Sequence, residues 1–166
     1  MAKSLDYTIV GVDPGLNKTG YAFLNVKDYK CSVLKMGVIS THGSSDLGRR
    51  ISLIVEEMRK HLSEFSPEFF VVEKIYSHIK YPYTSVLMAH ARGALLLCAM
   101  ERGMLIKDLP ASRVKKAITG NGRASKEQVR SVLSRMFEDE AIEKQPLDAS
   151  DALALALGYV FLERKF

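Results

Sequence analysis

The sequence predicts a single α/β domain in which helices flank a mixed central β-sheet, and two observations predict it. Two apolar, β-branched segments at residues 8–13 and 18–24 are separated by Pro14-Gly15, which is the pattern of a β-hairpin. Strand-like and helix-like patterns then alternate along the chain, as they do in α/β domains. A chain of 166 residues is most economically one domain, here residues 1–166, and buries roughly 70% of its unfolded surface.

The elements after the hairpin follow from apolar periodicity and from capping and breaking residues. We expect strands at 30–40, 69–73 and 104–106, and helices at 46–65, 85–102, 112–118, from Ser125 onward and at 152–162. Residues 74–84 are aromatic and basic, and we expect them to form an exposed loop because Pro82 argues against a continuous helix. The helix at 85–102 is apolar around much of its circumference, so it must be covered on more than one side.

Composition favours a soluble protein with a polyanionic partner. The formal charge is +5 and the pI is about 9.2, although ordinary soluble proteins also reach such values. Cys31 and Cys98 are too few for a zinc site or a disulfide framework, which fits a reducing compartment. The start of the chain lacks a secretory segment, and no apolar run approaches the roughly 18 residues of a membrane span. We therefore expect a cytoplasmic protein without membrane association.

Two buried strands each end in a carboxylate. Asp13 ends the first strand, and Glu73 ends the run Phe69-Phe70-Val71-Val72. In open α/β sheets, ligands bind at this carboxyl edge. An ionised carboxylate there loses several kcal/mol of hydration unless a metal ion or a basic side chain compensates it. Read alone, Asp13-Pro14-Gly15 is explained equally well as an ordinary hairpin turn.

A second pair of acids begins the last helix. Asp148 and Asp151 are three residues apart and share one helix face, and for this pair alone helix capping is the favoured explanation. Four converging carboxylates, however, repel one another unless divalent cations neutralise them, and oxygen ligands select Mg²⁺ or Mn²⁺. Two such ions roughly 4 Å apart can promote phosphodiester hydrolysis. The remaining candidates, His42, His61 and His78, are taken as surface residues, the serines lack a paired base, and no Walker A motif occurs.

An ordered set of motifs over nearly the whole chain resembles the RuvC family of Holliday junction resolvases. The segments are Gly11-Val12-Asp13-Pro14-Gly15, Thr19-Gly20-Tyr21, Val72-Glu73, Ala91-Arg92-Gly93, Val114-Lys115, Gly120-Asn121-Gly122, Ala124-Ser125-Lys126-Glu127-Gln128-Val129 and Asp148-Ala149-Ser150-Asp151-Ala152-Leu153-Ala154. The resemblance implies a ribonuclease H-like fold. It also implies a nuclease that acts in DNA recombination and repair.

The resemblance assigns roles to individual residues. Catalytic and metal-binding roles are implied for Asp13, Glu73, Asp148 and Asp151, and DNA-binding roles for Lys115, Lys126, Arg92 and Tyr76. The implied cofactor is Mg²⁺, with Mn²⁺ as a substitute, at two ions per subunit. The implied partners are four-way junction DNA, a second copy in a homodimer that nicks two strands symmetrically, and the branch-migration helicase complex of the same pathway.

Some residues depart from the family pattern. The segment between Glu73 and Arg92 is one residue longer than in familiar members and contains Pro82, and His90 stands where we expect glutamine. These departures bear on junction-centre geometry and sequence preference.

Other functions are less favoured by the sequence. Sugar-kinase and chaperone ATPases are disfavoured because they need two such domains. A non-enzymatic junction-binding protein is disfavoured because it need not keep the four acids. Another ribonuclease H-like nuclease with a different substrate is the main alternative, since fold does not fix substrate.

Overall fold

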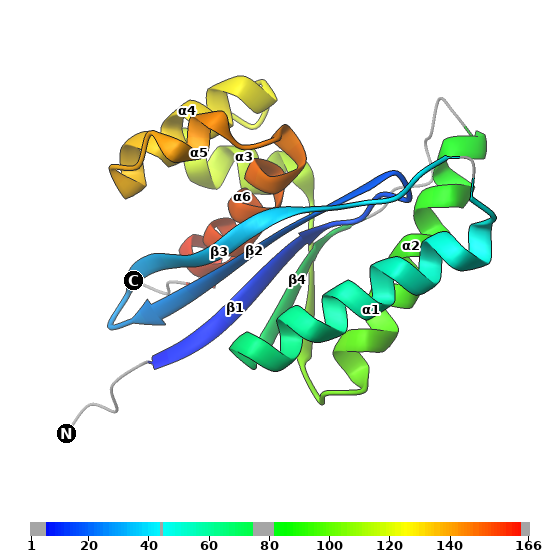
Figure 1. Cartoon of the computed structure of the whole chain (residues 1–166). Coiled ribbons are helices and arrows are strands. Elements are labelled where there is room, and N and C mark those ends of the chain that lie inside the picture. Colours follow the sequence, from blue (N-terminus) through cyan, green and yellow to red (C-terminus); the bar gives the residue numbers. More distant parts are fainter. Residues whose placement is uncertain (1–5, 44, 75–81, 164–166) are drawn as a thin grey trace.

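A mixed five-stranded sheet runs through the protein, with its strands in the order β3-β2-β1-β4-β5 (Figure 1). The computed structural model describes residues 6–43, 45–74 and 82–163. β1, β2 and β3 are antiparallel neighbours, whereas β4 is parallel to β1 and β5 is parallel to β4. The elements are β1 Asp6–Asp13, β2 Lys18–Lys27, β3 Lys30–Ser40, α1 Leu47–Phe65, β4 Phe69–Glu73, α2 Pro82–Met100, β5 Leu105–Leu109, α3 Ala111–Thr119, α4 Lys126–Phe137, α5 Ala141–Lys144 and α6 Leu147–Glu163.

Each face of the sheet has its own helical layer (Figure 1). α1 and α2 cover one face, where Val10, Val12 and Val72 pack among buried side chains of both helices. α6, backed by α3, α4 and α5, covers the other face, where Ile9 and Val71 lie in a second core. The alternation of neighbouring strand residues between these two cores follows from the pleat of a strand. The predicted α/β architecture with a mixed sheet is confirmed.

The two layers use helices of different kinds. α1 is amphipathic and presents Ile54, Met58 and Leu62 to the sheet. α6 is buried on nearly every side from Ala149 to Val160, because the sheet, α3 and α4 surround it. An element enclosed in this way gains by being apolar all round, which explains its small residues and leucines. Asp46 and Ser125, where we expect two of the helices to begin, cap α1 and α4, since each side chain accepts a hydrogen bond from a backbone amide of the first helical turn.

Several element boundaries differ from the prediction. α2 begins at Pro82 rather than at Ser85. Proline is tolerated there because the amide hydrogen that it lacks would have no partner within the helix in the first turn. β5 extends to Leu109. α5 was not predicted, and α6 begins at Leu147, five positions earlier than expected. Residues 75–81 of the expected loop, which include Tyr76 and His78, lie outside the described residues.

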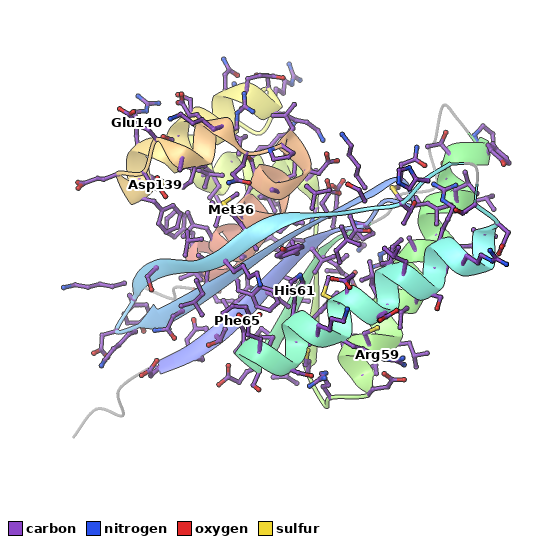
Figure 2. All side chains as sticks on the ribbon, in the orientation of Figure 1. Met36, Arg59, His61, Phe65, Asp139 and Glu140 are labelled. Carbon is purple, nitrogen blue, oxygen red and sulfur yellow. The ribbon has the colours of Figure 1, made fainter. Side chains whose placement is uncertain are left out.

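One further expectation, that His61 is a surface residue, was wrong, and the packing explains why. The His61 side chain is only 13% exposed and stacks on Tyr21 with ring centroids 4.4 Å apart. Figure 2 shows His61 and Phe65 on the side of α1 that faces the sheet. In the described part of the chain, α2 is long and apolar enough on average to cross a membrane, with a mean hydropathy of 1.2, although polar residues including His90 and Arg92 interrupt it. Length and composition alone make this weak support for a membrane span.

Candidate active site

β1 and β4 deliver two carboxylates to one edge and one face of the sheet. The two strands are parallel neighbours, and Val12 pairs with Val72 immediately before Asp13 and Glu73. Both valines lie in the core beneath α1 and α2. Because successive strand residues point to opposite faces, Asp13 and Glu73 are directed toward the layer that contains α6.

Two glycines allow α6 to lie directly against the strands that it covers. A Cβ atom on Gly20 would sit 1.9 Å from the carbonyl oxygen of Asp148, and one on Gly11 would sit 2.0 Å from that of Ala152. Gly20 is also the residue of β2 that pairs with Asp13. The absent side chain therefore brings the first turn of α6 next to the end of β1. Asp148 and Asp151 of that turn approach Asp13 for this reason.

The four carboxylates interact electrostatically. Burial raises the pKa of Asp13 to about 7, and repulsion from Asp151, Glu73 and Asp148 adds to the effect while Lys126 opposes it. Burial of its carboxyl also raises the pKa of Glu73, although much of the residue is exposed; Asp151 adds to that rise, and Lys126 and Lys115 counter it. The site predicted from the sequence is thus brought together in space: four acids and two lysines act on one another.

A hollow lies beside these acids. It has a volume of about 210 Å³, and β4, α3, α4 and α6 form its walls. Its charged lining comes from Glu73, Lys115, Lys126 and Asp151, and the remainder is largely apolar. The Lys126 ammonium donates a hydrogen bond to a carboxylate oxygen of Asp151. The hollow therefore combines acids that can hold cations with lysines that can bind phosphate.

The donor set fits divalent cations such as Mg²⁺ or Mn²⁺, which prefer carboxylate oxygens. Burial is the main cause of the raised Asp13 pKa, and repulsion from Asp151, Glu73 and Asp148 adds to it, so a bound cation would favour the ionised carboxylates of this site. In the part of the chain that the structure describes, no three acidic, histidine or cysteine side chains are already grouped as a metal cage. Lys126 instead supplies a positive charge at Asp151. Holding a divalent ion would therefore require small side-chain movements.

Comparison with known proteins identifies the family. The family model for the crossover junction endodeoxyribonuclease RuvC matches residues 9–159. The chain belongs to the RuvC family. RuvC of Rhodopirellula baltica is 34% identical over 90% of this chain and 83% of that protein, and RuvC of Streptomyces coelicolor is 36% identical over 92% and 81%. The structure of Thermus thermophilus RuvC in complex with a Holliday junction substrate matches with a TM-score of 0.84 at 25% identity, covering 95% of each chain.

Not every residue implied by the RuvC resemblance lies at this site. The Arg92 side chain is 19% exposed and forms an ion pair with Asp108 of β5. Asp108 pairs in register with Val72 and reaches α2, so the ion pair lies on the face of the sheet opposite to Glu73. Tyr76 falls outside the described residues. The DNA-binding roles of both residues stay predictions.

The close-approach glycines are the functional positions that sequence reasoning missed. In the sequence, Gly11 and Gly20 stand out only as members of two predicted strands and of two family motifs, which give no role to the missing side chain. A signal was available, because glycine inside a strand often marks the close approach of another backbone. The sequence does not reveal which element makes that approach, since α6 follows β2 by more than a hundred residues.

The raised pKa of Asp13 predicts a pH dependence for the metal-free protein. The pKa of Asp13 is 3.8 in the unfolded chain and about 7 in the folded protein. Between these two pH values the folded protein therefore keeps a proton that the unfolded chain has lost. In a chelator, the free energy of unfolding should fall as pH rises from about 4 to 7, by up to about 1.4 kcal/mol per pH unit. Denaturant unfolding at several pH values measures this slope. The Asp13→Asn variant should have a flatter profile, and an identical slope would contradict the assignment.

Proposed function

We propose that this RuvC family protein is a structure-selective DNA endonuclease that resolves Holliday junctions, acting as one nuclease domain over residues 1–166. It nicks two strands symmetrically, in DNA recombination and repair. The observation that carries the proposal is the convergence of Asp13, Glu73, Asp148 and Asp151, from β1, β4 and α6, beside two lysines. The likeness to a relative solved with a Holliday junction substrate supports the choice of DNA substrate.

The residues divide into two roles at the proposed active site. The four carboxylates would hold two Mg²⁺ ions per subunit, with Mn²⁺ as a substitute, and their negative charge would set the preference for divalent cations. The chemistry that such ions would supply here is activation of a water molecule and stabilisation of the leaving oxygen in phosphodiester hydrolysis. Lys115 and Lys126 line the same hollow and bind the backbone phosphates next to the cut. The acids supply the chemistry and the lysines position the strand.

A cleavage assay on three substrates tests the proposal. Four-way junctions, linear duplex DNA and an RNA–DNA hybrid of matched sequence are incubated with the protein and Mg²⁺. We expect paired nicks in the junction and little cutting of the other two. Preferential cutting of the hybrid or the duplex would favour the alternative, another ribonuclease H-like nuclease with a different substrate.

We further propose that the active species is a homodimer formed through α2. One face of this helix consists of exposed residues spaced three and four apart, the pattern of a helix that packs against another helix. These residues, which form what is called the α2 stripe below, are Tyr83, Val86, His90, Gly93, Leu97 and Met100. The large apolar side chains among them are 53% to 76% exposed. Exposed apolar surface costs roughly 25 cal/mol per Å², and a second copy would remove that cost.

The symmetry of the substrate agrees with such a dimer. A four-way junction has approximate two-fold symmetry, and an isologous dimer presents two equivalent sites to two equivalent strands. The same surface explains why α2 reaches the hydropathy of a membrane helix without requiring a membrane. On this basis we place the protein in the cytoplasm. The branch-migration helicase complex of the pathway is proposed as a further partner from the family resemblance.

Replacing Leu97 by glutamate should separate the dimer, because it places a charge in the middle of the α2 stripe. Light scattering at micromolar concentration should give twice the 18.5 kDa monomer mass for the original protein. For Leu97→Glu it should give the monomer mass itself. Leu34→Glu is the matched control, since Leu34 is 44% exposed on β3, away from the stripe. An original protein that is monomeric and still cuts both strands in one encounter would contradict the dimer.

A further inference from the structure

One ammonium group is built into the cluster of acids. Lys126, the first residue of α4, forms an ion pair with Asp151 on α6, and the two side chains are 53% and 21% exposed. Besides Asp151, its charge acts on Asp13, Asp148 and Glu73. A single side chain therefore offsets part of the repulsion within the whole carboxylate site.

The backbone that carries Lys126 is firmly held. Ser125 and Gln128 form a reciprocal capping box at the start of α4. The preceding turn is closed by bonds from the amides of Arg123 and Ala124 to Asn121. The lysine side chain, by contrast, is a flexible four-carbon stem with a partly exposed head. The ammonium can therefore leave Asp151 without any rearrangement of the helix.

The contact with Asp151 competes with a divalent cation. The oxygen that accepts the ammonium hydrogen bond belongs to a carboxylate assigned here to the metal site, and two positive charges near one oxygen repel each other. A phosphate group of bound DNA is negatively charged like the carboxylate, so it offers the ammonium another partner. The hollow shared by Lys126, Glu73 and Asp151 provides room for such an exchange.

We propose that Lys126 occupies the place of a divalent cation in the DNA-free protein and leaves Asp151 for a DNA phosphate when the junction binds. This inference rests on the proposed metal site. The exchange couples the two ligands, because DNA removes the competitor of the metal. By linkage, metal binding strengthens DNA binding by the same factor. The protein thereby completes its metal site on the substrate and holds metal weakly without it.

Titration of Mn²⁺ into the DNA-free protein, followed by calorimetry, tests the exchange. Lys126→Met should bind Mn²⁺ roughly threefold to tenfold more tightly than the original protein, or bind one more ion, because the competing charge is gone. Lys116→Met is the matched control, since Lys116 is an exposed lysine of α3 outside the hollow, and its affinity should not change. Unchanged or weaker Mn²⁺ binding by Lys126→Met would overturn the proposal.

Junction binding in a chelator supplies the second half of the test. Lys126→Met should bind the junction more weakly, with a salt dependence reduced by about one phosphate contact. Opposite changes in metal and DNA affinity are the signature of exchange. A lysine that only contacts DNA would leave Mn²⁺ affinity unchanged, and a lysine that only supports the fold would weaken both, so either result refutes the exchange.

Two further variants keep the outcomes separable. Lys126→Arg retains the charge and should restore Mn²⁺ affinity to within about twofold of the original, which also excludes a general folding defect. Asp151→Asn removes the proposed metal ligand and should weaken Mn²⁺ binding. If Asp151→Asn binds Mn²⁺ normally, the metal site itself is misassigned. If only the Lys126 variants fail to behave as stated, the exchange is wrong while the metal site stands.

Discussion

Replacing Asp13 by asparagine is expected to reduce junction cleavage on the order of 10³-fold, because the amide keeps the shape of the side chain but removes a charge from the proposed metal site. The amides of Glu73, Asp148 and Asp151 should act in the same direction. Junction binding in a chelator should persist, since the lysines proposed to contact phosphate are unchanged. Single-turnover cleavage and a gel-shift titration measure the two effects separately.

Asp6→Asn is the control for this loss. Asp6 is an exposed acid at the opposite end of the same strand, so its amide should cleave at the original rate. Normal cleavage by any two of the four site amides at saturating Mg²⁺ would show that the site is misassigned. Loss of junction binding in parallel with cleavage would instead indicate damage to the fold.

The second large effect is expected for Gly20→Ala. The added methyl group would have to share space with the backbone carbonyl of Asp148, which lies 1.9 Å from the Cβ position, so α6 must move away from β2. We expect the free energy of unfolding to fall by about 1–3 kcal/mol or more. A displacement of about 1 Å between Asp148 and Asp13 should also reduce cleavage on the order of 10²-fold in the variant that remains folded.

Gly43→Ala separates this effect from a general cost of replacing glycine. A Cβ on Gly43 meets no atom within 4 Å, so stability and cleavage should both be preserved. Denaturant unfolding and cleavage at a temperature where both variants are folded make the comparison. A Gly20→Ala protein with original stability and activity would contradict the role given to the close packing of α6.

The sequence predicts the strands and the acids because each is encoded locally. The run before Asp13 and the run before Glu73 are continuous and apolar, and each ends where its strand ends. Asp46 and Ser125 sit one position before their helices and cap them with their own side chains. Such features need only short-range interactions, so periodicity and capping rules locate them.

Features that depend on distant segments are not encoded in this way. Pro82 reads as a helix breaker unless one knows that it occupies the first turn of α2. His61 looks like a surface residue of an amphipathic helix until Tyr21, forty positions earlier, is found beneath it. The partners of Arg92 and Lys126, on β5 and α6, depend likewise on tertiary packing. Electrostatic pairs between elements follow from the fold and cannot be read from spacing along the chain.

The location of a bound divalent cation tests the central assignment most directly. Crystals of the protein soaked in Mn²⁺ can be measured for anomalous scattering, which places the metal independently of any assumption about activity. We expect a peak bounded by Asp13, Glu73, Asp148 and Asp151, roughly 2.0–2.4 Å from carboxylate oxygens, with the Lys126 ammonium displaced from Asp151. A strong peak elsewhere, with none among these four acids at saturating Mn²⁺, would contradict the account.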